Sequence, residues 1–205
     1  MAWAPASSQI FRSFPEGIGL EAGGGHNQLK WHVNAIHPSA AGDFNRQEFS
    51  LTPIVRLTYG IYPESFFRIY PFVGYNRFGG RSAEMSYGYK DEFWIDAVEL
   101  GLIGTYVVDD YEFGVGVKHN RHIKMIQRYY GTAGQGSNRS WQEQEETIFF
   151  RNYSSDVGIK LTRNLSHWSI SGESWFGISH IDTEFVNELV DIYENHFRIL
   201  IGYRL

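Results

Sequence analysis

The amino-acid sequence predicts an all-β fold, an eight-stranded antiparallel up-and-down transmembrane β-barrel, on the strength of three observations. Segments with an apolar residue at every second position recur along almost the whole chain. Several of these segments exceed the about 5–6 residues of an ordinary strand and reach the about 9–11 residues with which a tilted strand crosses a bilayer. Within each segment one parity carries large apolar residues, whereas the other parity carries glycine, hydroxyl and charged residues.

The clearest element is a hairpin in the middle of the chain. Alternating residues over 93–108 and over 111–122 flank Asp109-Asp110, which is long enough only for a tight turn. Before the turn Leu100 and Leu102 share a parity, and after it Val115 and Val117 do the same. The pattern predicts two long antiparallel strands joined by two residues.

The first strand is expected to start near residue 16, and its apolar parity changes between Ala22 and Leu29. We expect a β-bulge at Gly23-Gly24-Gly25, because one extra residue would reconcile the two registers. The other strands are expected over about 46–62, 66–78, 148–162 and 168–179, and the last strand ends the chain.

The connections alternate in length. Short turns are expected at 63–65, 109–110 and 163–167, and longer polar loops at 34–45, 79–91, 128–147 and 180–190. This alternation places the short turns and both chain ends on one side of the barrel. Residues 1–15 are expected to form an irregular extension, and 16–205 a single barrel domain.

The composition excludes some classes of protein. The net charge of −5 gives no broad basic field, so we expect no nucleic-acid partner. The sequence contains no run of about 18 apolar residues, so we expect no transmembrane helix. The first residues lack the basic and apolar regions of a signal peptide, so we expect a mature chain from which an export signal has been removed.

The architecture resembles the small eight-stranded outer-membrane barrels of the OmpA and OmpX type over about 16–205. The final stretch, Phe197-x-Ile199-x-Ile201-x-Tyr203-x-Leu205, is similar to the C-terminal sorting strand of such proteins. The resemblance implies an integral protein of the bacterial outer membrane, in contact with membrane lipids, with its short turns in the periplasm and its long loops outside. The alternative is a soluble barrel of lipocalin type, but large apolar residues on eight strands would overfill so narrow an interior.

The polar parity carries charges that are expected at one height in the lumen. Neighbouring strands should bring Glu21 to Arg56 and Arg198, Lys118 to Asp156, and Glu173 to Arg198. Because unpaired buried charges are strongly disfavoured, mixed signs at one height predict an ion-pair network and therefore a plugged barrel. The predicted network consists of Glu21, Arg56, Lys118, Asp156, Glu173 and Arg198, with Glu99 slightly higher.

Two outward-facing residues on neighbouring strands, His119 and Ser155, are the candidate catalytic pair, since a histidine can activate a serine as a nucleophile. No third member of a triad is evident. No metal or cofactor is expected, because the chain has no Cys and no His-x-x-x-His pair.

The main functional prediction is a non-enzymatic outer-membrane barrel whose loops form a binding surface for a protein partner, or which serves as a subunit of a larger assembly. Two alternatives stay open. One is a lipid-modifying hydrolase or acyltransferase that uses His119 and Ser155, and the other is a narrow pore for small polar solutes. Fold alone does not decide between them.

Overall fold

The computed structural model describes residues 17–33, 47–48, 51–64, 66–82, 90–132, 139–144, 151–181 and 190–205, which include ten strands. Within these ranges no helix has the length and apolar character needed to cross a membrane. The barrel strands are β1 (Gly17–Val33), β3 (Leu51–Glu64), β4 (Phe67–Ser82), β5 (Lys90–Val108), β6 (Tyr111–Thr132), β8 (Tyr153–Leu165), β9 (Trp168–Gly177) and β10 (Val190–Arg204). Two short strands, β2 (Gln47–Glu48) and β7 (Arg139–Gln144), pair with β4 and β6 respectively.

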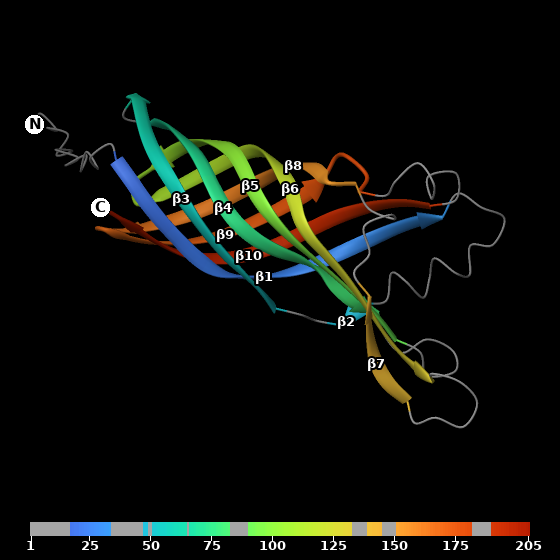
Figure 1. Cartoon of the computed structure of the whole chain (residues 1–205). Helices are drawn as coiled ribbons and strands as arrows, with labels where there is room; N and C mark the ends of the chain where they lie inside the picture. The colour runs from blue at the N-terminus through green and yellow to red at the C-terminus, as the bar shows by residue number, and fades with distance from the viewer. Residues whose placement is uncertain are drawn as a thin grey trace, which may run out of the picture.

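The eight long strands close into an antiparallel barrel, as the sequence predicts (Figure 1). Each strand pairs with its neighbours in chain order, and β1 pairs with β10 to close the sheet. In that closing pair Gly19 lies opposite Arg204, so the start of β1 and the end of β10 lie at the same end of the barrel. This end also carries the short turns, and we call it the turn end.

The tight turn at Asp109-Asp110 is confirmed, and Asp109 adopts a φ of 53°. Aspartate tolerates this left-handed conformation better than most residues. The predicted turn at 163–167 is shorter than expected, because β8 continues to Leu165 and only Ser166 and His167 remain between the strands. Ser166 also has a left-handed φ, of 60°.

Two predicted loop boundaries are wrong. Strand β4 continues to Ser82 and β5 begins at Lys90, so residues 79–82 and 90–91 of the expected loop are strand, and 83–89 lie outside the described residues. Strand β6 likewise continues to Thr132 and pairs with β7, so the expected loop at 128–147 contains a hairpin. Backbone pairing there continues through polar and glycine-rich sequence, where side-chain alternation gives no signal. The extension at 1–15 and the loop at 34–45 lie outside the residues that the structure describes, as does most of the loop at 180–190.

The β-bulge predicted at Gly23-Gly24-Gly25 is also wrong. Strand β1 pairs with β3 and β10 without a register shift, and its parity change has another cause. Leu29 faces the lumen and is 1% exposed, because the part of the lumen farthest from the turn end is apolar. The lumen-facing residues there form what we call the apolar cap: Leu29, Phe78, Ile95, Ala97, Met125, Ile181 and Ile192.

A β-bulge does occur in β6. Asp96 pairs with Lys124 and Ala97 with His122, so Ile123 is the extra residue between them. The bulge changes the parity that faces the lumen from His122 to Met125, both of which are buried. It therefore lets β6 contribute to the apolar cap.

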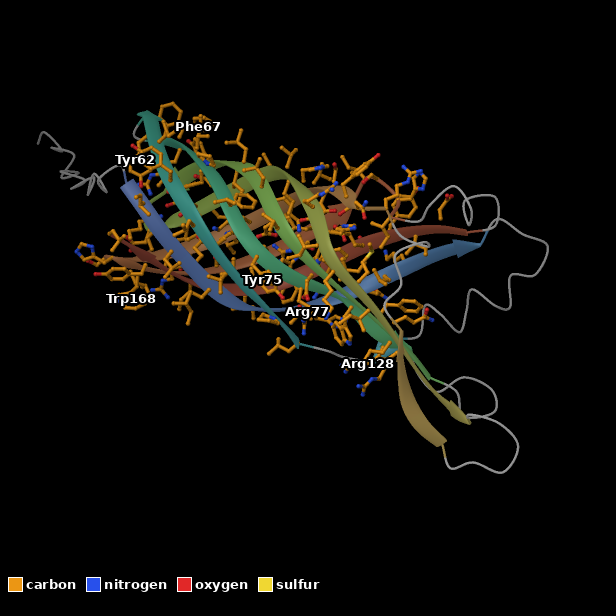
Figure 2. All side chains as sticks on the ribbon, viewed as in Figure 1. Tyr62, Phe67, Tyr75, Arg77, Arg128 and Trp168 are labelled. Atoms are coloured by element: carbon orange, nitrogen blue, oxygen red, sulfur yellow. The ribbon has the colours of Figure 1, made fainter. Side chains whose placement is uncertain are left out.

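The outer wall is a continuous apolar band. At least one large apolar side chain on every barrel strand is exposed. Figure 2 shows side chains projecting from the barrel along its length, with Phe67 and Trp168 near the turn end and Arg77 and Arg128 toward the other end. A soluble lipocalin-like barrel would reverse the two faces, so the fold is that of a transmembrane barrel. The band includes Leu20, Leu57, Val73, Leu102, Val115, Ile159, Ile170 and Ile199.

Candidate functional site

Backbone register places the charged side chains of the lumen. Glu21 lies opposite Arg56 in the pairing of β1 with β3, so both side chains share the inner face. The Arg56 guanidinium donates to Glu21 at 2.5 Å and crosses the lumen to Glu173 on β9. Lys160 of β8 lies 2.7 Å from Glu21 and 3.4 Å from Glu173. Two acidic and two basic residues therefore form a closed, charge-balanced group, which we call the lower network.

Aromatic side chains and glycines complete the lower network. The Arg56 guanidinium carbon lies 4.7 Å from the centroid of the Phe72 ring, and the Trp175 indole N–H donates to Glu173 at 2.9 Å. A Cβ atom at Gly158 would lie 2.5 Å from the Trp175 ring. Glycine at position 158 therefore leaves room in the narrow lumen for the Trp175 side chain.

A second group, the upper network, lies next to the first. Glu99 accepts a hydrogen bond from Arg198 at 2.8 Å and from Lys118 at 3.3 Å. Lys118 also forms an ion pair with Asp156 at 2.9 Å. All four side chains are completely buried. Unlike the lower network, this one continues into further acidic and imidazole groups on β10.

The structure brings all seven residues of the predicted charge network into the lumen. It places Glu21 against Arg56 and Lys118 against Asp156, as the strand heights suggest. Arg198 forms its ion pair with Glu99, rather than with Glu21 or Glu173. Barrel shear offsets neighbouring strands, so heights counted from the turns do not fix partners on non-adjacent strands.

Sequence reasoning missed a third charged group at the turn end. Glu112 accepts hydrogen bonds from Arg68 at 2.6 Å, from Arg204 at 2.9 Å and from the Asn164 amide at 2.8 Å. It also missed Lys160 of the lower network. Lys160 shares the parity of Asp156, so the alternation that found Asp156 also contains the signal for Lys160.

The candidate catalytic residues, His119 and Ser155, do meet on the outer wall. They lie opposite each other in the pairing of β6 with β8, and Nδ1 of His119 lies 3.0 Å from Oγ of Ser155. The His119 ring stacks on Tyr153 at 5.8 Å. Among the described residues no carboxylate is hydrogen-bonded to His119, so no acid orients the imidazole. The pair lines an open apolar groove together with Leu100, Leu102, Val117 and Ile178.

Fold and surface together define a small integral membrane barrel. The chain is similar to solved structures of such barrels. Neisserial surface protein A matches with 10% identity over 92% of this chain and 97% of that chain, at a TM-score of 0.48. Ail, the attachment invasion locus protein of Yersinia pestis, in complex with sucrose octasulfate, matches with 12% identity over 93% of this chain and 100% of that chain, at a TM-score of 0.46. The outer membrane protein OprG of Pseudomonas aeruginosa matches with 7% identity over 93% of this chain and 97% of that chain, at a TM-score of 0.39. No protein-family model and no curated protein matches the chain.

Proposed function

We propose that the protein is an integral protein of the bacterial outer membrane with a closed lumen and no enzymatic activity. Its working surface is the part that projects beyond the lipid band, where it binds a protein partner or joins a larger assembly. Closed antiparallel barrels with an apolar outer wall are the class of protein that the outer membrane holds. Membrane lipids then surround the band that includes Leu102 and Val115.

The observation that supports a closed lumen is that buried side chains from opposite walls meet across it. Arg56, Glu99 and Arg198 reach into the lumen and are fully buried, and the apolar cap lies beyond them. One cavity in the lumen, lined by Glu21, Tyr70 and other residues, measures about 20 Å³. That volume accommodates about one water molecule, which is too little for a hydrated solute to pass.

The projecting strands support the binding role. Strand β6 is 22 residues long and ends at Thr132. Its last part, residues 127–132, pairs with β7. Figure 1 shows β7 and the ends of β5 and β6 standing away from the barrel wall. Paired strands give such a projection a defined shape, which a contact surface for another protein requires.

A conductance measurement tests the closed lumen. Wild-type protein inserted into planar bilayers is expected to show no steady single-channel conductance, because ion pairs such as Arg56–Glu173 cross the lumen. Heat-modifiable migration of protein recovered from the same membranes establishes that the barrel has folded. Steady conductance from folded protein would refute the closed lumen and favour the narrow pore.

A second candidate function rests on the contact between His119 and Ser155. In a lipid hydrolase the serine Oγ would attack an ester carbonyl while the imidazole accepts the hydroxyl proton. The ester C–O bond would then break as the imidazolium protonates the departing alcohol, and water would hydrolyse the acyl-serine to release the fatty acid. The 3.0 Å separation and the apolar groove at the edge of the lipid band favour this candidate. The missing acid partner within the described chain weighs against it.

Incubation of the purified barrel with phospholipid and lipid A separates the two candidates. We expect no release of acyl chains above background, because no carboxylate of the described residues is hydrogen-bonded to the His119 imidazole. Released product that disappears in both His119→Ala and Ser155→Ala would instead establish the hydrolase. Ser174→Ala is the matched control, since Ser174 lies on β9 with the same outward parity as the apolar residues Ile170 and Phe176.

A further inference from the structure

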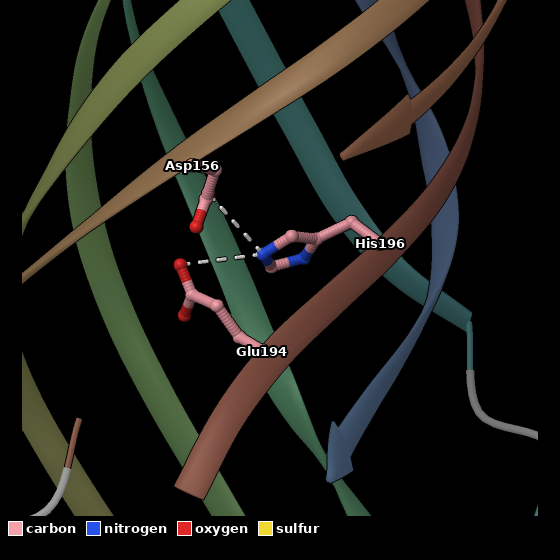
Figure 3. A group of neighbouring side chains, drawn as sticks. All are labelled: Asp156, Glu194 and His196. Atoms are coloured by element: carbon pink, nitrogen blue, oxygen red, sulfur yellow. Dashed lines mark ion pairs between the residues drawn. The ribbon is translucent and has the colours of Figure 1, made fainter. Parts of the chain in front are cut away.

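Three ligand-type side chains converge inside the barrel beside the upper network. Asp156 comes from β8, and Glu194 and His196 come from β10, where residues two apart face the same side (Figure 3). Nε2 of His196 lies 3.5 Å from a Glu194 oxygen and 3.7 Å from an Asp156 oxygen. All three residues are at most 2% exposed.

The surrounding hydrogen bonds fix which His196 nitrogen bears the proton. The Asn27 amide nitrogen faces the Arg77 carbonyl at 3.2 Å, and a carbonyl can only accept. Asn27 therefore turns its oxygen toward Nδ1 of His196, which lies 2.5 Å away and must donate. In neutral His196 this leaves the lone pair on Nε2, pointing at the two carboxylates.

A lone pair facing two carboxylates is repulsive unless a positive charge lies between them. Nε2 of His196 and Oδ1 of Asp156 make no hydrogen bond with any described residue, and both atoms are buried. A proton on Nε2 would not complete the site, because contacts of 3.5 and 3.7 Å are too long for hydrogen bonds. The arrangement instead leaves space for a larger cation.

We propose that Asp156, Glu194 and His196 bind a divalent transition-metal ion of the zinc class inside the barrel. Imidazole nitrogen and carboxylate oxygen are ordinary ligands of such ions. In a tetrahedral site with bonds of about 2.0–2.2 Å, neighbouring ligand atoms are about 3.3–3.6 Å apart. One ligand atom from each of the three residues lies within 4.8 Å of the other two, which brings them near that spacing.

Neighbouring groups support the three ligands in the way that metal sites require. The Asn27 oxygen orients the His196 ring, as a carbonyl or carboxylate does for most metal-bound histidines. The Asn120 amide donates to Asp156 at 3.0 Å and to Glu194 at 2.6 Å, and so holds the carboxylates in place. Lys118 occupies Oδ2 of Asp156 at 2.9 Å, which leaves Oδ1 for the ion.

The ion is structural rather than catalytic, because the site is sealed from solvent. The Phe78 ring of the apolar cap lies 5.3 Å from the His196 ring and covers it. Strands β8 and β10 both flank β9, so a shared ion fastens two strands that are not themselves paired. The ion would enter while the barrel folds. This inference does not depend on the proposed function, since a sealed ion stabilises the barrel whatever its external surface binds.

The test is metal binding by the full chain without a polyhistidine tag. Protein refolded in detergent with Co²⁺ or Zn²⁺, then freed of excess ion, is expected to retain about one ion per chain, with visible absorption bands from bound Co²⁺. His196→Gln should retain less than about a tenth of that amount. His119→Ala, which removes an outward-facing histidine from β6, is the matched control and should retain the full amount.

Two further measurements make the outcome decisive. Zn²⁺ should raise the temperature of unfolding of the wild type but not of His196→Gln, and Asn27→Ala should weaken binding by about 10–100-fold without changing the stoichiometry. Asp156→Asn replaces His196→Gln if that variant does not fold. Folded wild type that retains no ion refutes the site. Loss of the ion in His119→Ala but not in His196→Gln also refutes it, because the ion would then lie on the outer wall.

Discussion

Replacing Arg56 with methionine is expected to lower the free energy of unfolding by about 3–5 kcal/mol, the cost of removing one partner from a buried ion pair. The guanidinium bonds both Glu21 and Glu173, and its side chain is fully buried. Without it, Lys160 alone faces two carboxylates. Methionine retains much of the volume over Phe72, so the loss reports charge rather than packing.

Urea unfolding in detergent micelles measures this effect. Arg163→Met is the matched control, because Arg163 lies on the outer wall beside the Tyr111 ring and contributes no charge to the lumen. The control should unfold close to the wild type. The double variant Arg56→Met, Glu173→Gln should recover part of the loss, since the stranded carboxylate is then neutral. Equal midpoints for Arg56→Met and Arg163→Met would show that the lower network does not stabilise the barrel.

Arginine at Val115 is expected to cost about 2–4 kcal/mol of unfolding free energy, because it would lie in the lipid near the middle of the bilayer. Val115 is 69% exposed and lies between Phe113 and Val117, both also exposed, in the apolar band. Its partners in the neighbouring strands, Gly104 and Ile159, carry no charge that could pair with the arginine.

The matched control for Val115→Arg is Ile123→Arg on the same strand. Ile123 is 60% exposed but lies beyond His119 and Arg121, outside the apolar band. Near the interface an arginine costs about 0–1 kcal/mol, since its guanidinium reaches water or lipid headgroups. Urea unfolding of protein folded into lipid vesicles gives both values. Equal costs at the two positions would contradict the assignment of the membrane-spanning band.

Much of the fold could be predicted from the sequence because one simple rule, alternation, decides which face each strand residue takes. The rule is clearest near Leu102 and Val115, where lipid outside and charge inside make the two faces chemically opposite. It failed at Leu29, because there the lumen itself is apolar and the parity change mimics a bulge. It also failed near Ser82 and Thr132, where strands continue by backbone pairing through sequence with no alternation.

The part of the candidate site that joins adjacent strands could also be predicted from the sequence. Counting residues from the turns gives the height of a side chain on its strand, and this brings Lys118 to Asp156 on the adjacent strand. It cannot give partners across the lumen, such as Arg198 and Glu99, because these depend on shear and side-chain reach. The group of Asp156, Glu194 and His196 was missed because it joins β8 to β10, which are not paired with each other. Its members also share no sequence motif.

Several lumen contacts join residues that are far apart in the sequence, and this separation limits how the barrel can form. Lys160 meets Glu21 from 139 positions away, and His196 meets Asn27 from 169 positions away. A half-formed sheet would leave Glu21 and Lys160 only the partners on their neighbouring strands, Arg56 and Glu173. It would also expose the polar lumen face to hydrocarbon, where each unsatisfied group costs several kcal/mol. We therefore expect concerted insertion, in which the first and last strands join before or while the wall enters the lipid. Intermediates with an open seam should be too unstable to accumulate.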